Sequence, residues 1–262
     1  MFGSVFVVHF IGKKQVNCRY FMSKSDGEKR VVLVTGGAKR VGRAIVETMA
    51  ARGWEVVFTY NTSRNESASV KSTNADISCV KADFNELDRY GKELRAAVEA
   101  KARLDALVNC ASIYQPDPEG WDQAFHRRMF AVNLEAPLRL ADWFAPMLRA
   151  SRGHVVNMVD LLAERPWSKF RAYCSSKAAL ANATLSLARQ LAPEVTVNGI
   201  APGVVDWPPG FPDDEKAKYL RRVPLDRAGT PEDVANLVHF LLTQGSYITG
   251  QIIRLDGGRS IT

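Results

Sequence analysis

Short apolar runs bounded by turn residues alternate with longer amphipathic stretches from Val31 to the end of the chain. This alternation is typical of βαβ units, in which helices cover both faces of a parallel sheet. The sequence therefore predicts an α/β fold built on one doubly wound parallel sheet of about seven strands flanked by helices. The predicted strands are Val31–Thr35, Glu55–Tyr60, Ser78–Ala82, Ala106–Cys110, His154–Met158, Thr196–Ile200 and Gln251–Leu255, and the predicted helices are Val41–Arg52, Glu86–Ala102, Trp121–Leu148, Ala172–Leu191 and Pro231–Thr243.

The chain divides into a basic N-terminal stretch and one long body. A length of 262 residues is enough for one large domain with a substantial core. Residues 31–262 are predicted to form that domain, and residues 1–30 a loosely ordered extension, with Met22 as a second candidate start. The apolar stretch before Lys13 is too short to span a bilayer, and its positive charges follow it, unlike those of a secretory signal.

One proline-rich segment, at about 204–225, interrupts the alternation. It contains four prolines together with Trp207 and Phe211. This composition is too rich in proline for a continuous element and too aromatic for a mere linker. Two interpretations stay open: a lid over the substrate, with Trp207 as a contact, or a long surface connection whose aromatic residues pack locally.

The net charge of +7 is partly local, because residues before Val31 contribute +4 of it. Basic side chains beside a phosphate-bearing cofactor account for part of the remainder. Without a basic helix carrying interleaved aromatics, we expect no nucleic-acid partner. The four cysteines lie far apart and lack zinc-type spacing, which indicates free thiols in a reducing, cytoplasmic compartment and no metal site.

A turn rich in small residues follows the first predicted strand. Gly36 to Gly42 reads Gly-Gly-Ala-Lys-Arg-Val-Gly and precedes an amphipathic helix. Small residues let the backbone approach a pyrophosphate, and the free N–H groups at the helix start face the anion. Arg40 stands where a common dinucleotide fingerprint has glycine, so the prediction depends on the strand and helix around the turn. The predicted cofactor contacts here are Gly36, Lys39, Arg40 and Val41.

The second predicted strand ends without a carboxylate. An NAD-specific site would place Asp or Glu there to accept from the ribose hydroxyls, but the chain reads Tyr-Asn-Thr-Ser-Arg from Tyr60 to Arg64. A 2′-phosphate would be bound by basic and polar side chains, which favours NADP(H). The residues predicted to bind this phosphate are Lys39, Asn61, Ser63 and Arg64, with Arg64 as a solvated loop residue the alternative.

The next two strand ends carry further candidates for the same cofactor. Asp83 could accept a hydrogen bond from the adenine amino group, and Asn109, Ala111 and Ser112 follow the fourth strand. Asp and Asn after a strand are more often turn formers than ligands. Their order along the chain and their placement at strand ends favour the cofactor interpretation.

Tyr173 and Lys177 lie four residues apart on a predicted helix, hence on one face. An ammonium group beside a phenol favours the phenolate, so Lys177 is expected to lower the pKa of Tyr173 and ready the phenol as a proton donor. Asp160 stands thirteen residues before the tyrosine, after the fifth predicted strand. With the nucleotide turn, these residues predict a reductase that moves a hydride and a proton.

From Val31 to Thr262 the sequence resembles the short-chain dehydrogenase/reductase family. The resemblance implies a Rossmann-type fold, an NADP-dependent oxidoreductase and a homotetramer. It further implies that Tyr173 is the acid, that Lys177 also holds the nicotinamide ribose, and that Asn133 anchors a proton-relay water. The motifs that carry it, in family order, are Gly36 to Gly42, Asp83, Asn109 with Ala111, Asn133, Tyr173 with Lys177, Pro202 with Gly203, and Leu255 to Gly258.

Asp160 departs from the family pattern, which has a serine that hydrogen-bonds a substrate carbonyl. An ionised carboxylate can only accept hydrogen bonds, and it would repel an oxygen that gains negative charge. It suits a substrate rich in N–H groups. In this feature the chain resembles the pteridine reductase branch, which pairs Asp and Tyr at the spacing of Asp160 and Tyr173. That resemblance implies that Arg40 and Ser112 contact the pterin or cofactor phosphates and that Tyr114 sandwiches the planar ring.

The expected activity is therefore NADPH-dependent reduction of a C=N bond in a dihydropteridine or dihydrofolate-like ring. A generic carbonyl reductase, such as a 3-oxoacyl-carrier-protein reductase, is the alternative if Asp160 is protonated or turned away. A catalytically silent NADP(H)-binding sensor is a further alternative, against which the intact Tyr173, Lys177 and Asn133 argue.

Overall fold

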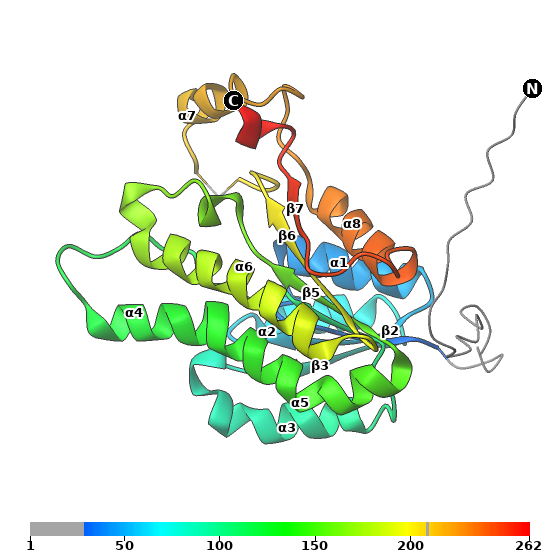
Figure 1. The fold of residues 1–262 in the computed structure, drawn as a ribbon. Coiled ribbons are helices and arrows are strands. Elements are labelled where there is room, and N and C mark those ends of the chain that lie inside the picture. The colour runs from blue at the N-terminus through cyan, green and yellow to red at the C-terminus, as the bar shows by residue number, and fades with distance from the viewer. Residues whose placement is uncertain (1–28, 208–209) are drawn as a thin grey trace, which may run out of the picture.

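A seven-stranded, entirely parallel sheet forms the centre of the molecule, with the strand order β3-β2-β1-β4-β5-β6-β7 (Figure 1). The computed structural model describes residues 29–207 and 210–262. Most of the predicted extension and two prolines of the segment at 204–225 therefore lie outside the described residues. The strands are β1 Val31–Val34, β2 Glu55–Tyr60, β3 Ile77–Lys81, β4 Ala106–Asn109, β5 His154–Met158, β6 Thr196–Pro202 and β7 Ile252–Leu255.

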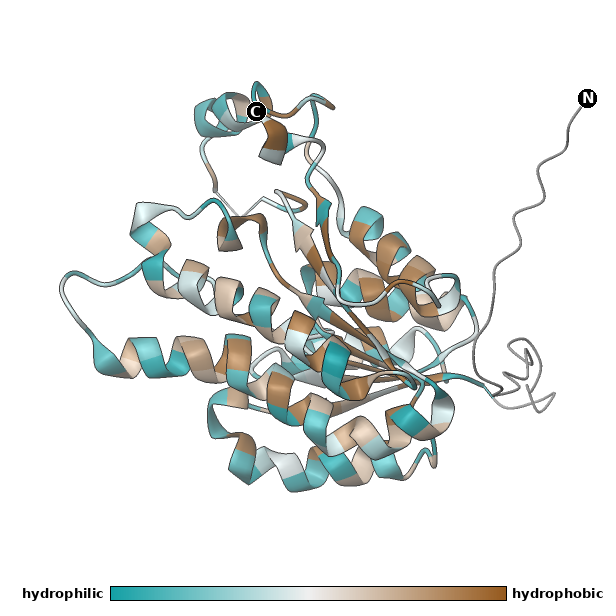
Figure 2. Ribbon diagram, viewed as in Figure 1, coloured by the Kyte–Doolittle hydropathy of each residue, from teal (hydrophilic) through white to brown (hydrophobic). Residues whose placement is uncertain are grey.

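Helices cover both faces of the sheet, and each face has its own core. In β1, Val32 and Val34 pack on the side of α1 and α8, whereas Val31 and Leu33 pack on the side of α3, α5 and α6. A strand buried on both faces needs a continuous apolar run, and β1 has one. Figure 2 shows the hydrophobic stripes of the helices along this sheet. The helices are α1 Arg40–Ala51, α2 Arg64–Ser72, α3 Leu87–Glu99, α4 Gln123–Phe130, α5 Ala136–Ser151, α6 Arg171–Leu191, α7 Asp213–Leu220 and α8 Pro231–Thr243.

The predicted fold class is confirmed, and the differences concern helices. α2 was not predicted, and the predicted helix Trp121–Leu148 consists of α4, the π-helical segment Ala131–Glu135 and α5. α8 begins at its predicted residue because Thr230 and Asp233 form a reciprocal capping box and Pro231 occupies the first turn. Among the described residues, no helix has both the length and the apolar character needed to cross a membrane.

The segment at about 204–225 contains the short helix α7, which its prolines concealed in the sequence. The Trp207 ring lies 5.0 Å from that of Phe211 and 5.5 Å from that of Tyr219 on α7. Its aromatic residues therefore pack locally, as one interpretation predicts. The same three side chains also line the large cavity described next, as a lid would.

Candidate active site

A cavity of about 880 Å³ opens at the carboxyl ends of the strands. Each of the first six strands contributes to it where the strand ends, and the segment after β6 forms one wall. Ligands of doubly wound sheets bind at this edge. The contributing residues at the strand ends include Gly36, Asn61, Asp83, Ala111, Asp160 and Gly203.

The turn between β1 and α1 is closely packed, which explains its small residues. Gly36 has φ +70°, and a Cβ there would lie 2.9 Å from the Ala111 Cα. A Cβ at Gly42 would lie 2.1 Å from the Gly36 carbonyl oxygen. Thr35 Oγ1 accepts from the backbone N–H of Cys110 and of Ala111, each at 2.9 Å, and so ties this turn to the end of β4. The backbone therefore lines the cavity without side chains in the way.

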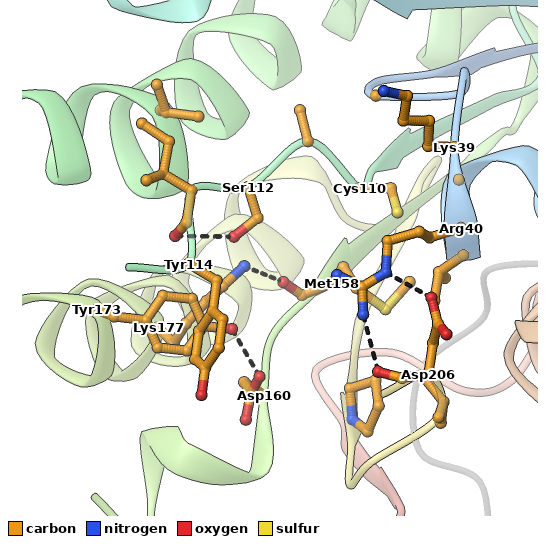
Figure 3. Close-up of a pocket in the computed structure, with 18 of the residues that line it drawn as sticks. Lys39, Arg40, Cys110, Ser112, Tyr114, Met158, Asp160, Tyr173, Lys177 and Asp206 are labelled. Carbon is orange, nitrogen blue, oxygen red and sulfur yellow. Dashed lines mark hydrogen bonds and ion pairs between the residues drawn. The ribbon is translucent and has the colours of Figure 1, made fainter. Parts of the chain in front are cut away.

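Arg40 adopts φ +52°, a left-handed conformation in which the usual glycine of a dinucleotide turn would be unstrained. Its side chain reaches across the cavity mouth. Arg40 Nε donates to Asp206 Oδ2 at 2.5 Å, and a terminal nitrogen donates to the Asp206 carbonyl at 2.8 Å (Figure 3). The arginine thus joins the nucleotide turn to the segment that follows β6.

The predicted phosphate-binding residues separate into two groups. Lys39 and Asn61 line the cavity, whereas Ser63 and Arg64 begin α2 outside the described lining. Lys39 Nζ pairs with Glu66 Oε1 at 2.7 Å, and this hydrogen bond lowers the pKa of Glu66. A carboxylate therefore lies beside Lys39 after all, in the first turn of α2, a helix that the sequence did not reveal.

Two other predicted cofactor residues have structural roles. Asp83 lines the cavity, and its side chain also accepts from the Asn85 N–H at 2.9 Å as a turn former. Asn109 is buried and donates to Asn157 Oδ1 at 2.8 Å, and its own Oδ1 is buried without a hydrogen-bond partner among the described residues. The other predicted cofactor residues Val41, Ala111, Ser112, Pro202 and Gly203 also line the cavity.

Asp160 and Tyr173 meet at the cavity wall. Tyr173 is held by the first turns of α6, and its hydroxyl donates to Asp160 Oδ2 at 2.6 Å (Figure 3). Asp160 Oδ1 accepts from the Leu162 N–H at 2.8 Å, which fixes the carboxylate at the start of a 3₁₀ turn. Both oxygens of Asp160 therefore act as acceptors, in agreement with the sequence interpretation.

Burial dominates the protonation of this pair. It raises the pKa of Asp160, while the Tyr173 hydroxyl, the Leu162 N–H and the charge of Lys177 act in the opposite direction. Burial, followed by the charge of Asp160, raises the pKa of Tyr173 well above 10. The phenol therefore holds its proton at neutral pH.

The predicted effect of Lys177 on this phenol is wrong for the structure. Lys177 Nζ donates to the Met158 carbonyl at 2.8 Å and lies 5.8 Å from the centre of the Tyr173 ring (Figure 3). Burial lowers the pKa of Lys177 to about 8. Tyr173 can still donate a proton, but desolvation and Asp160 prevent the acidification that the four-residue spacing suggests.

Asn133 lies in the π-helical segment, fully buried behind the cavity. Its Oδ1 accepts from the Ile113 N–H at 2.8 Å and from Ser112 Oγ at 3.1 Å, and its Nδ2 donates to the Ile113 carbonyl at 3.0 Å. π-helical turns inside α-helices are frequent at functional sites. The asparagine therefore holds the loop after β4 that presents Ser112 and Tyr114.

Aromatic side chains lie beside the hydrogen-bonded pair of Asp160 and Tyr173. The Tyr114 ring stacks on Phe170 at 4.6 Å and meets Tyr173 edge-on at 4.9 Å. Tyr114 and Trp207, the two aromatic residues predicted to contact the substrate, both line the cavity. Phe170 did not emerge from the sequence, because it lies in an irregular connection.

The cavity lining also includes residues that the sequence did not single out, among them Arg165, Tyr219 and Arg259. Tyr219 lies on α7, which the prolines concealed. Arg259 directly follows the Gly257–Gly258 pair after β7, and its position at a strand end is the signal that could have identified it.

These residues fit a nicotinamide dinucleotide. The cavity is large enough, the glycine turn opens its backbone to an anion, and cavity-lining residues with hydrogen-bonding groups continue from Asn61 to Lys177. Gly36, Lys39, Asn61, Asp83, Tyr173, Lys177 and Gly203 are the residues that would hold it.

Comparisons with known proteins agree with this geometry. Residues 36–260 match the family described as enoyl-(acyl carrier protein) reductase. Relatives include a galactitol 2-dehydrogenase of Agrobacterium fabrum, 31% identical over 87% of this chain and 96% of its own. Pteridine reductase 1 of Leishmania tarentolae is 32% identical over 88% and 96%. A 3-oxoacyl-[acyl-carrier-protein] reductase of Aquifex aeolicus is 34% identical over 87% and 96%.

Solved structures of related proteins share this fold. A short-chain dehydrogenase/reductase structure from Burkholderia xenovorans superposes with a TM-score of 0.81 at 29% identity, covering 89% of this chain and 99% of the other. The chain therefore belongs to the short-chain dehydrogenase/reductase family, and it is an oxidoreductase that uses a nicotinamide cofactor.

Proposed function

We propose that the protein reduces a C=N bond of a dihydropteridine or dihydrofolate-like ring with NADPH. The observation that carries the proposal is the 2.6 Å hydrogen bond from the Tyr173 hydroxyl to Asp160, a carboxylate at the position where most of the family has serine. A buried acceptor prefers a substrate that offers N–H groups. A ketone offers only an oxygen that becomes more negative during reduction.

Each residue of the site has a separate role in the proposed reaction. The cofactor, when bound, supplies the hydride. Tyr173 holds the proton that a ring nitrogen receives, and Asp160 keeps the hydroxyl oriented and accepts from N–H groups of the ring. Tyr114, at the cavity mouth, offers a face for a planar heterocycle. The Lys177 ammonium, buried at 2% exposure, contributes positive charge beside the pair.

A panel of substrates tests this proposal directly. Purified protein should oxidise NADPH, followed by its absorbance in a stopped-flow instrument, with dihydrobiopterin, dihydromonapterin or dihydrofolate. Reduction of a 3-oxoacyl thioester should be much slower. Absence of turnover with every pteridine, together with robust thioester reduction, would refute it.

The cofactor preference for NADP(H) is part of the proposal. Lys39 is the basic residue that lines the adenosine end, and β2 ends without a carboxylate. Glu66 competes for Lys39, but an exposed ion pair contributes only about 0–1 kcal/mol, so a 2′-phosphate can displace it. Fluorescence titration should give a lower Kd for NADPH than for NADH, and Lys39→Met should narrow that difference.

One observation favours carbonyl reduction as a second candidate. Burial raises the pKa of Asp160, and a protonated carboxyl could donate to a carbonyl oxygen. The thioester arm of the panel decides between the two candidates.

We also propose that the protein is a homotetramer, as is common in the family. A tetramer would have four times the 29.0 kDa mass of the chain. Light scattering after size-exclusion chromatography measures this mass, and a dimer or monomer would exclude it.

A further inference from the structure

Arg259 brings a positive charge to the end of the cavity where the segment after β6 forms the wall. It lines the cavity together with Trp207 and Tyr219, and its guanidinium carbon lies 5.4 Å from the Tyr219 ring centre. Its Nε is buried and has no hydrogen-bond partner among the described residues. A buried guanidinium N–H without an acceptor is costly, and a ligand oxygen would remove that cost.

The neighbouring carboxylates are already engaged. Asp206 pairs with Arg40, and Asp160 accepts from Tyr173 and from the Leu162 N–H. Asp256, three residues before Arg259, accepts from the backbone N–H of Gly258 at 3.0 Å and of Ser260 at 2.7 Å. Arg259 therefore lines the cavity and forms no ion pair with any described residue.

The turn that carries Arg259 is built to fix its position. Gly257 and Gly258 have φ +62° and +87°, and a Cβ at either would lie 2.8 Å from Val223 or Pro224. Arg165 donates to the Ser260 carbonyl and, at 3.2 Å, to that of Thr262. Such bracing lowers the entropic cost of holding an arginine in place for a ligand.

We propose that Arg259 is a specificity-determining residue that binds a carboxylate on the part of the substrate extending from the reduced ring toward the lid. This inference rests on the proposed function and narrows it to pteridines with an acidic tail, of the dihydrofolate type. Asp160 accepts from the N–H groups of the ring, and Arg259 donates to the acid. The two opposite charges at separate places in one cavity orient such a molecule.

Steady-state kinetics with dihydrofolate and dihydrobiopterin test the proposal. Arg259→Met keeps an apolar stem against Tyr219 but removes the charge. It should raise the KM for dihydrofolate about 10- to 100-fold, with kcat and the KM for dihydrobiopterin nearly unchanged, because a hydrogen bond to a charged group is worth about 1.5–3 kcal/mol. Arg259→Lys should restore part of the affinity, and Arg221→Met, at an exposed site outside the lining, is the matched control.

Equal losses with both substrates would reduce Arg259 to a structural role and overturn the proposal, as would an unchanged KM for dihydrofolate. If the wild-type protein reduces no pteridine, the proposed function fails by that result. The carboxylate-binding role of Arg259 is then tested separately, by ligand-observed NMR with p-aminobenzoylglutamate and the NADP⁺-loaded protein. Binding that Arg259→Met abolishes supports the carboxylate site, and absence of binding to the wild type excludes it.

Discussion

Tyr173 keeps its proton because it is buried beside a carboxylate. It can therefore donate a proton to a substrate even though its pKa is not lowered. Its hydroxyl donates to Asp160 at 2.6 Å, and Lys177 donates elsewhere. We predict that Tyr173→Phe lowers kcat about 10²- to 10⁴-fold, the usual contribution of a positioned acid. The Kd for NADPH should rise by no more than about tenfold, because Tyr173 would supply one hydrogen bond among the several groups that would hold the cofactor. Stopped-flow kinetics and fluorescence titration measure the two quantities.

The matched control for that variant is Tyr90→Phe, which removes a hydroxyl on α3 outside the described cavity lining. It should leave kcat unchanged. A Tyr173→Phe protein with more than about a tenth of wild-type kcat would show that another group supplies the proton.

Lys177 gives the unliganded protein a pH-dependent stability. Burial lowers its pKa from 10.5 to about 8, so between these values the unfolded chain binds more protons than the folded protein. The free energy of unfolding therefore rises with pH in this window, and the penalty of burying the charge is fully present below it. Between pH 7.5 and 9.5, the free energy of unfolding of the wild type should therefore increase by about 2 kcal/mol more than that of Lys177→Met.

Urea denaturation at several pH values measures this difference. Taking wild type minus variant removes the contributions of Tyr173 and Cys110, whose raised pKa values oppose the trend at higher pH. A difference that stays flat with pH would mean that Lys177 is not desolvated in the folded protein.

Among the elements, the π-helical segment between α4 and α5 is hydrogen-bonded through Asn133 to the loop after β4, which carries Ser112. Asn133→Ala would leave the partly buried Ile113 N–H and carbonyl without the hydrogen bonds that Asn133 makes to them. Each such loss costs about 1–3 kcal/mol, so the free energy of unfolding should fall by about 2–4 kcal/mol. Urea denaturation of the variant checks this value, with the exposed Asn65→Ala as control. A loss below about 1 kcal/mol would contradict the structural role.

Elements were predictable from the sequence where burial repeats with a regular period. β2, β5 and α8 have their predicted limits, because each carries an uninterrupted apolar pattern. α2 and α7 were not predicted: α2 has one buried apolar residue, Val70, and α7 buries none. Helices that contact the core so little leave no periodic signal. Yet α2 carries Glu66 and α7 carries Tyr219, so part of the site was missed because these two helices were not predicted.

At the scale of the whole molecule, the topology determines which distant residues meet. A parallel sheet brings every strand's carboxyl end to one edge, so the strand-end positions of Asp83, Ala111, Asp160 and Gly203 predicted a shared site. The sequence pattern does not predict which partner each side chain contacts. It could not reveal that Lys177 donates to the Met158 carbonyl or that Arg40 reaches Asp206.

The central claim is that the carboxylate of Asp160 selects a nitrogen heterocycle over a ketone. The most direct test is the ratio of kcat/KM for a dihydropteridine to kcat/KM for a 3-oxoacyl thioester, measured for wild type and Asp160→Ser. We predict that the serine variant lowers this ratio at least about 100-fold, by losing pteridine reduction and gaining thioester reduction. An unchanged or higher ratio would contradict the account.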